Sequence, residues 1–257
     1  FGLAQLSPFT RNSKAWKDLM ALPSIEDRVN ALRNETTRAK LIAEGIEAGD
    51  MKNLAHMLHP FGIDSKPNLD FARQQSLLQL AEAEGKDPVE VYVERLLASE
   101  GREFFNFWMF GGNLDNQWKY MQLPHVVPML GDAGAHVGFF TDTDSPTVLL
   151  SELTREQGVY SLPEAVHRIT GKSAAIIGLK ERGELREGWH ADINVIDYEN
   201  LSTCHPEYVN DFPHGGGRFV VKGKGYDATI VGGKVIIKNG KHTGHRPGRV
   251  IREFVRG

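Results

Sequence analysis

The hydrophobic pattern of the chain changes near Gly188, and this change limits the folds that the chain can adopt. Before Gly188, helical spacing of apolar residues alternates with short continuous apolar runs, which is the order of a parallel sheet covered by helices. After it, single apolar and polar residues alternate, as in antiparallel strands. We therefore expect one domain over residues 1-188 and an antiparallel domain over residues 189-257.

Two turn signals support the antiparallel arrangement. The alternating residues lie at 191–197 and 227–244. Gly232-Gly233 and Asn239-Gly240 interrupt the second stretch, and such dipeptides are typical of the tight turns in β-hairpins.

Three helices are expected before the first strand, each with a recognisable start and end. They cover residues 24–45, 76–85 and 87–101. Ser24 can cap the first of them, and Gly45 or Gly49 can end it. The third is the clearest, because Asp87 can cap it and Pro88 occupies its first turn.

Strand and helix patterns then alternate up to residue 170. Strands are expected at 103–110 and 126–130, and helices at 116–123, 145–156 and 161–170. Asn113 or Asp115 can cap the first of these helices, and Ser145 and Ser161 the other two. A complete α/β barrel takes about 250 residues, yet we find only three or four strand and helix units before Gly188. The chain is therefore expected to form part of such a barrel.

The composition is that of an ordinary globular protein, with 40% hydrophobic and 25% charged residues. A net charge of -3 gives no basic field for nucleic acid or an anionic membrane, so neither is an expected partner. The single cysteine, Cys204, fits a reducing compartment, and no apolar run reaches the roughly 20 residues of a membrane span. We expect a cytoplasmic protein, and, because the chain begins at Phe1, a segment upstream of it.

Asp132 is the strongest catalytic candidate. It follows the apolar run 126–130 and lies between Gly131 and Gly134, at the position where a barrel strand would end. A carboxylate there can bind a metal ion or accept a proton from water. The alternative is that Gly131-Asp132 is only a turn.

His136 and Asn113 are candidates for contacts with a substrate. His136 can also bind a metal or hydrogen-bond to Asp132, or it can be an ordinary packed or solvated histidine. Asn113 can instead cap a helix. Asp142 and Asp144 are expected to be acids at the entry of the following helix.

Other histidines, and one arginine near them, are expected to have structural roles. These are His56 and His59 in "HMLHP" and His214, with Arg218, in "DFPHGGGRF". Turn residues surround both pairs, which favours loops over a metal site or a ligand site. We find no phosphate-binding glycine fingerprint and no serine or cysteine nucleophile motif.

Residues 131–150, "GDAGAHVGFFTDTDSPTVLL", resemble the segment after the last barrel strand in the N-acyl-D-amino-acid deacylase branch (the D-aminoacylase-like branch) of the amidohydrolase superfamily. Residues 161–197, 225–253, 1–9 and 22–42 are similar to the same family. The resemblance implies the C-terminal part of a (β/α)8 TIM-like barrel, followed by strands of a small β-sandwich. It also implies a zinc-dependent amide hydrolase.

The resemblance implies a role for Asp132 as a metal ligand, and as the general base and then the general acid in hydrolysis of an N-acylated D-amino acid. Gly131 departs from the family, which often has serine or threonine before this aspartate. A histidine-x-histidine metal motif, expected upstream, does not occur in the 257 residues.

We therefore expect catalysis to require an N-terminal barrel half or a partner chain. The isolated chain should self-associate, because a half-barrel exposes strand edges. Two alternatives stay open. The chain is a non-catalytic scaffold or interaction subunit, or the enzyme acts on another amide or a cyclic amide.

Overall fold

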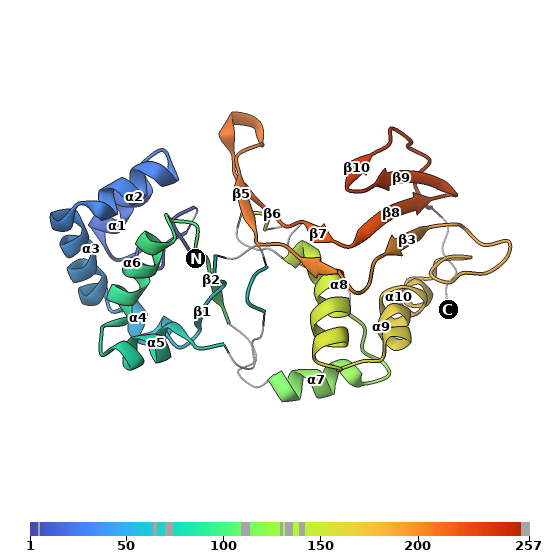
Figure 1. The fold of residues 1–257 in the computed structure, drawn as a ribbon, viewed down its shortest axis with the longest axis horizontal. Helices are drawn as coiled ribbons and strands as arrows, with labels where there is room; N and C mark the ends of the chain where they lie inside the picture. Colours follow the sequence, from blue (N-terminus) through green and yellow to red (C-terminus); the bar gives the residue numbers. More distant parts are fainter. Residues whose placement is uncertain are drawn as a thin grey trace. The chain divides into compact units, whose positions relative to one another are not determined.

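The computed structural model describes residues 1–4, 6–63, 66–69, 74–108, 114–128, 131, 136–138 and 142–252. The chain divides into two compact units (Figure 1). The first contains residues 1–114, 136–140 and 205–220, and the second contains 115–135, 141–204 and 221–257. The division into a barrel part over 1-188 and a sandwich part over 189-257 stays a prediction.

The first unit is mainly helical in the described residues. Its elements are α1 (Lys14–Met20), α2 (Ile25–Arg33), α3 (Glu35–Ala48), α4 (Asp50–Leu54), β1 (Leu58–Pro60), α5 (Leu77–Glu84), α6 (Pro88–Ala98), β2 (Phe105–Phe107), β5 (Glu207–Val209), η4 (Pro213–Gly215) and β6 (Arg218–Val220). Both β1 with β2 and β5 with β6 pair antiparallel.

Helix caps explain where the helices of this unit begin and end. Ser24 caps α2 and Asp87 caps α6, as predicted. The single helix predicted over 24–45 is wrong, because Asn34 has an extended backbone and its side chain accepts a hydrogen bond from the Thr37 N–H, starting a new helix. That helix ends at Gly49, whose φ of 74° is the left-handed conformation of a helix end.

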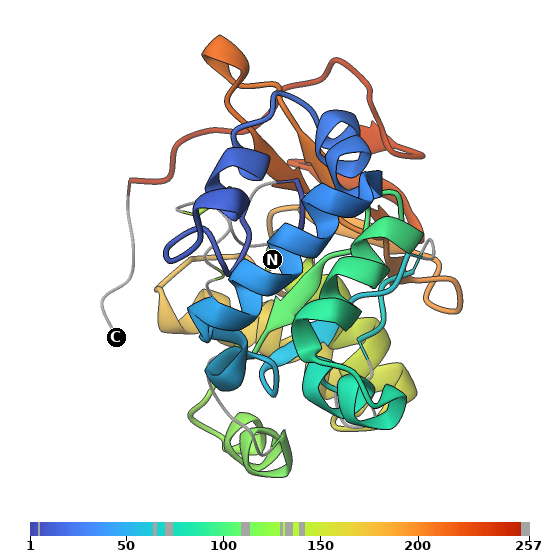
Figure 2. The same cartoon turned by 90° about the vertical axis from the view of Figure 1, so that its left-hand side faces the viewer.

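Aromatic side chains form the core of the first unit. The Phe9 and Trp16 rings lie 4.6 Å apart and those of Tyr92 and Phe105 lie 4.7 Å apart, all fully buried or nearly so. Gly45 lies inside α3 rather than at its end. A β-carbon at this position would be 2.8 Å from Val89 of α6, so the close approach of the two helices requires glycine. Figure 2 shows α3 and α6 side by side, which is the approach that this glycine permits.

The second unit combines helices with an antiparallel sheet. Its elements are α7 (Leu114–Gln122), η2 (Asp142–Asp144), α8 (Ser145–Val148), η3 (Leu149–Glu156), α9 (Leu162–Ile169), α10 (Gly171–Ile176), β3 (Ile193–Ile196), β4 (Ser202–Thr203), β7 (Gly223–Lys224), β8 (Tyr226–Val231), β9 (Lys234–Lys238) and β10 (Lys241–His242). Its apolar core contains Leu149, Leu150, Leu153, Tyr160, Ala165 and Leu201.

The antiparallel region was predicted correctly from its turns. Strands β10, β9, β8 and β3 form one sheet in that order, and every neighbouring pair is antiparallel (Figure 1). Gly232 and Gly233 have positive φ between β8 and β9, and so do Asn239 and Gly240 between β9 and β10. These are the conformations that a two-residue hairpin turn needs.

Two predicted elements before this sheet differ in the structure. The described residues 126–128 of the predicted strand are not in a strand, because the Val126 carbonyl is bound by side chains and Pro128 has no N–H to donate. The predicted helix over 145–156 starts as α8, and Leu149–Glu156 then forms a π-helix. Ser145 is the first helical residue, and Asp144 takes the cap position without a side-chain cap bond.

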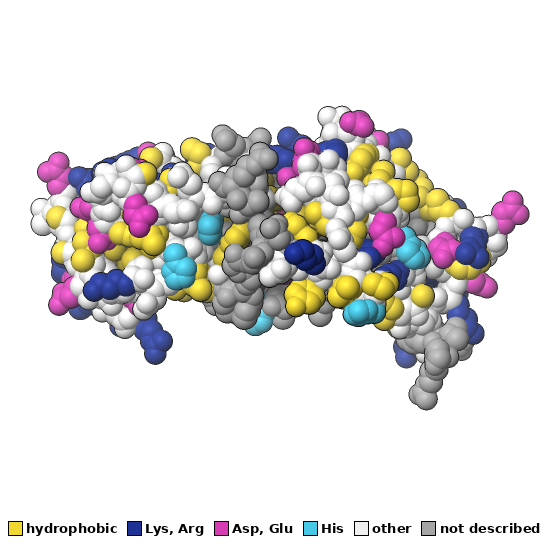
Figure 3. All heavy atoms as spheres, turned by 90° about the horizontal axis from the view of Figure 1, so that it is seen from below, with side chains coloured by type: hydrophobic (Ala, Val, Ile, Leu, Met, Phe, Trp, Pro, Cys, Tyr) yellow, Lys and Arg dark blue, Asp and Glu magenta, His cyan; other side chains and the backbone are white. Residues whose placement is uncertain are grey.

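The chain therefore has a mixed α and β fold. In the part that the structure describes, every strand pair is antiparallel, so the parallel pairs expected before residue 189 are not among them. None of the described helices has the length and apolar character needed to cross a membrane. Figure 3 shows Lys and Arg side chains interspersed with Asp and Glu on the face that it presents.

Candidate functional site

Of the three predicted site residues, the structure describes only His136. Asp132 and Asn113 lie outside the described residues, so their roles stay predictions. His136 is exposed and belongs to the first unit. Next to it, the Val137 carbonyl accepts a hydrogen bond from the Phe219 N–H at 2.9 Å.

The other histidines flagged in the sequence lie in the first unit. His59 is buried on β1, and its ring lies 4.6 Å from that of Trp108. Desolvation by burial lowers the pKa of His59. Arg218 forms a two-bond ion pair with Asp211 across the turn that contains His214, as expected for a structural turn.

A cavity of about 500 Å³ in the second unit begins where the predicted catalytic segment starts. It is lined by Pro128, Gly131, Asp142, Ser145, Pro146, Leu149, Ile169 and Ser173. Most of this lining is apolar, with a carboxylate and two hydroxyl groups among it. Small-molecule sites commonly have this composition, in which a few polar groups orient an otherwise apolar ligand.

Gly131 and Asp142 lie in direct contact on the wall of this cavity. A β-carbon at position 131 would be 2.7 Å from Oδ2 of Asp142 and 3.1 Å from its backbone oxygen. No side chain therefore fits at position 131 while Asp142 keeps its place. This contact accounts for the glycine at position 131, where the family that the sequence resembles often has serine or threonine.

Asp144 stands at the cap position of α8, but its side chain binds Thr203 instead of the helix backbone. Thr203, which is buried, donates a hydrogen bond from Oγ1 to Oδ2 of Asp144. Desolvation by burial raises the pKa of Asp144, although the Thr203 hydrogen bond opposes this effect. The prediction that Asp142 and Asp144 stand at a helix entry is correct in position, since η2 leads directly into α8.

The π-helix η3 brings polar side chains into the interior next to the cavity. Ser151 donates to the Thr147 carbonyl at 2.8 Å, and Thr154 donates to the Leu149 carbonyl at 2.7 Å. The hydroxyl groups of Thr147 and Tyr226 lie 2.8 Å apart and share a hydrogen bond. A π-helix of this length is rare, and π-helical turns often occur at functional sites.

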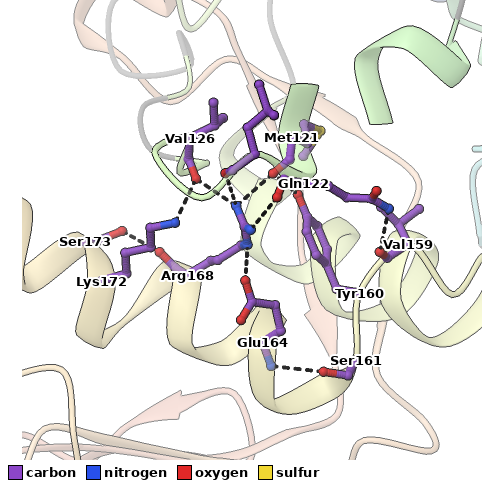
Figure 4. Close-up of polar contacts among 11 residues, drawn as sticks. Met121, Gln122, Val126, Val159, Tyr160, Ser161, Glu164, Arg168, Lys172 and Ser173 are labelled. Carbon is purple, nitrogen blue, oxygen red and sulfur yellow. Dashed lines mark hydrogen bonds and ion pairs between the residues drawn. The ribbon is translucent and has the colours of Figure 1, made fainter. Parts of the chain in front are cut away.

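A buried guanidinium on α9 belongs to Arg168, the residue before Ile169 in the cavity lining, and Figure 4 shows its polar contacts. Arg168 is 4% exposed, pairs with Glu164 at 2.6 Å and donates to four backbone carbonyls. Ser161 caps α9 by accepting a hydrogen bond from the Glu164 N–H, as predicted. The Glu164 carboxylate binds Arg168.

Sequence reasoning missed Arg168. The available signal was the Glu164 and Arg168 pair at i and i+4 on one helix, but such pairs are usually solvated and contribute little. Only the fold shows that the arginine is buried.

The described residues contain no group of three His, Cys, Asp or Glu side chains arranged to hold a metal ion. Among the described residues, Asp142 places its carboxylate against Gly131, and Asp144, nearby in the sequence, already accepts a hydrogen bond from Thr203. The described part of the site therefore does not by itself fit a zinc ion. Any metal site must use residues outside it, such as Asp132.

The sequence matches the model of the Amidohydrolase family over residues 4–237. Because this match covers most of the chain, the protein belongs to the amidohydrolase family. Within that family it is D-aminoacylase-like, as the resemblance in residues 131–150 implied.

Two relatives come from Alcaligenes xylosoxydans xylosoxydans. The chain is 38% identical over 106 residues to an N-acyl-D-aspartate deacylase, covering 41% of this chain and 19% of the relative. It is 33% identical over 78 residues to a D-aminoacylase, covering 25% of this chain and 16% of the relative. A dihydroorotase of Endomicrobium trichonymphae is 36% identical over 94 residues, which cover 35% of this chain and 21% of the relative.

Solved D-aminoacylase structures were also matched. The first, a D-aminoacylase mutant with copper chloride, has a TM-score of 0.42 and 18% identity, and the match covers 85% of this chain and 53% of that one. A second, described by its binuclear metal centre, has a TM-score of 0.38 and 18% identity, covering 82% and 51%. The chain spans about half the length of these D-aminoacylases, and its matches to the curated relatives span about a fifth of theirs or less.

Proposed function

We propose that the chain is the C-terminal part of a metal-dependent hydrolase that cleaves the amide bond of N-acyl-D-amino acids. Membership of the amidohydrolase family supports hydrolysis of an amide. The observation that carries the substrate class is the similarity to two deacylases that act on D-amino acid derivatives, an N-acyl-D-aspartate deacylase and a D-aminoacylase. The products are a carboxylic acid and a free D-amino acid.

Asp132 is the proposed acid and base. As water attacks the amide carbonyl, its carboxylate accepts the proton of that water and then transfers the proton to the departing amine nitrogen. A bound zinc ion would lower the pKa of the attacking water. Asp132 is proposed to contribute one oxygen ligand to the metal, and the other ligands are proposed to come from outside the described residues.

The cavity at Gly131 is the proposed place for an apolar part of the substrate. Pro128, Leu149 and Ile169 supply apolar surface, and Ser173 supplies a hydroxyl group. Because Gly131 directly precedes Asp132, a group bound in this cavity lies beside the segment that carries the acid and base. Contacts of His136 and Asn113 with the substrate remain part of the proposal.

The fold of the whole enzyme is proposed to be a (β/α)8 TIM-like barrel with a small β-sandwich. The chain's part of it would be the C-terminal half of the barrel and the antiparallel sheet of β3, β8, β9 and β10. The short coverage of the relatives and the lack of a histidine-x-histidine motif support a requirement for an N-terminal half. A non-catalytic scaffold is the competing proposal for the chain alone.

A cyclic amide is a second candidate substrate. The similarity to a dihydroorotase favours it, because that name describes an enzyme acting on a ring that contains an amide bond. Hydrolysis of a ring amide leaves one product molecule, whereas deacylation releases two.

Product formation from a matched panel, measured as free amine for the N-acyl amino acids and as ring opening for the cyclic amide, tests the proposal. The protein in its full native length, supplied with zinc, is incubated with N-acetyl-D- and N-acetyl-L-amino acids and with dihydroorotate. Amine release from D substrates alone is the expected result. Turnover of dihydroorotate alone would favour the cyclic amide, and turnover of no substrate would favour the scaffold.

A further inference from the structure

Arg168 carries a charge that is almost completely removed from water. Its side chain is 4% exposed, and Glu164, which is 44% exposed, is the carboxylate that neutralises it. A guanidinium in such a place needs acceptors for all its N–H groups. Figure 4 shows that Glu164 accepts from Nε and that backbone carbonyls of a separate segment accept from Nη1 and Nη2.

These acceptors belong to one short stretch of chain. Nη1 donates to the carbonyls of Met121, Leu123 and Val126 at 2.7, 3.2 and 2.8 Å, and Nη2 donates to that of Gln122 at 3.0 Å. The last carbonyls of a helix have no partner within it, and α7 ends at Gln122. Arg168 therefore binds the end of α7 and the turn that follows it.

Two neighbours strengthen the same attachment. Lys172 donates from Nζ to the Val126 carbonyl at 3.3 Å, and the Tyr160 hydroxyl donates to the Met121 carbonyl at 2.8 Å. The Arg168 guanidinium lies over the Tyr160 ring, 5.0 Å from its centre. The segment from Met121 to Val126 is thus held at both ends.

This segment leads directly into the cavity wall. Pro128 and Gly131 follow Val126 and line the cavity. On the α9 side, Ile169 follows Arg168 and also lines it. Ser173, another lining residue, donates from Oγ to the Arg168 carbonyl at 2.7 Å. Arg168 therefore connects the two walls of the cavity.

We propose that Arg168 is a positioning residue that fixes the segment from Met121 to Val126, which leads to the cavity-lining residues Pro128 and Gly131. A buried ion pair can often be replaced as a whole by apolar side chains without loss of stability, so stability alone does not explain its presence. The planar guanidinium donates hydrogen bonds to four carbonyls of one segment and so fixes the position of that segment. The ammonium group of a lysine cannot make the same set of hydrogen bonds. The consequence for catalysis, through Asp132 next to Gly131 in the sequence, rests on the proposed function.

The test compares Arg168→Lys with Arg155→Lys in the full-length protein. Arg155 is a matched control, because its guanidinium lies over the Tyr198 ring and donates to the Tyr198 and Glu199 carbonyls in the same unit, away from the cavity lining. Arg168→Lys should lower kcat for an N-acyl-D-amino acid by about 10- to 100-fold with a smaller change in KM, since small misplacements cost that much. Arg155→Lys should leave both constants within about 2-fold.

Hydrogen exchange provides a measurement that does not depend on activity. In Arg168→Lys, amides of residues 121–131 should exchange about 10-fold faster, while those of β8 and β9 keep their rates. Unchanged exchange in 121–131, or acceleration equal in every segment in both Arg168→Lys and Arg168→Gln, would overturn the proposal. If the unaltered protein hydrolyses no substrate, the proposed function fails, and exchange alone decides the role of Arg168.

Discussion

Gly131 lies so close to Asp142 that a β-carbon at position 131 would be 2.7 Å from Oδ2 of the carboxylate. The two residues face each other on the wall of one cavity. Their contact joins the possible turn at Gly131-Asp132 to the predicted helix entry at Asp142. It also means that neither residue can change size without affecting the other.

Gly131→Ala should destabilise the second unit by about 1 to 3 kcal/mol, the usual cost of an added methyl group where there is no space. Gly248→Ala is the control, since nothing lies within 4 Å of a β-carbon there. Urea unfolding of both variants gives the comparison. Equal stability of the two variants would show that the contact with Asp142 is not restrictive.

The contact also predicts coupling between the two positions. In an Asp142→Ala background, Gly131→Ala should cost less, because the carboxylate that it meets has been removed. A double-mutant cycle measures the difference. Strict additivity of the two substitutions would contradict the direct contact.

The hydrogen bond from Thr203 to Asp144 predicts a stability effect that depends on pH. Thr203→Val should destabilise the second unit by about 1 kcal/mol at neutral pH, because a partly buried carboxylate loses its donor. Burial raises the pKa of Asp144, so the folded state binds the proton more tightly than the unfolded state. The contribution of Asp144 to the free energy of unfolding is fully present below its usual pKa of 3.8, and it is lost as pH rises through the higher pKa of the folded state.

The loss of Thr203 should raise the folded pKa further and so enlarge that effect. Urea unfolding of wild type and Thr203→Val at several pH values measures it. The destabilisation should be greater at neutral pH than at acid pH. A destabilisation that is the same at every pH would rule out the contribution of the ionised carboxylate.

The burial of His59 leads us to expect the opposite pH dependence for the stability of the first unit. Burial lowers its pKa below the usual 6.5, so the unfolded state binds the proton more readily. The contribution of neutral His59 to the free energy of unfolding is fully present above pH 6.5, and it falls as pH decreases towards the lower pKa of the folded state. His59→Phe should remove this fall while keeping the ring contact with Trp108.

Unfolding monitored by tryptophan fluorescence between about pH 7.5 and 5 measures the effect of His59. His56→Gln is the control, because His56 is an exposed neighbour and its replacement leaves His59 in place. A slope that persists in His59→Phe would assign the pH dependence to other groups.

Local signals in the sequence predicted the caps and turns. Ser24, Asp87 and Ser161 cap helices, and Asn239 with Gly240 forms a hairpin turn, because each of these depends on a few adjacent residues. The break at Asn34 was missed because its asparagine side chain competes with the helix in a run that otherwise has helical spacing.

Contacts between distant residues were not predictable in the same way. A dense aromatic run correctly suggested a strand at 103–110; among its described residues, 103–108, the strand is Phe105–Phe107, which pairs with β1 nearly 50 residues earlier. Arg168 looked like a solvated helix residue, and its four carbonyl partners lie more than 40 positions away. The resemblance in residues 131–150 identified the family, which the spacing of Asp132 and its glycines left undecided.

Turnover by Asp132→Asn is the most direct test of the proposed chemistry. The full-length protein and this variant are assayed with zinc on an N-acetyl-D-amino acid, and Asp227→Asn, an exposed change on β8, serves as the control. Loss of the acid and base should lower kcat by about 100-fold or more in Asp132→Asn, with Asp227→Asn unaffected. A variant at Asp132 that keeps the wild-type kcat would contradict the assignment of Asp132 as the catalytic acid and base.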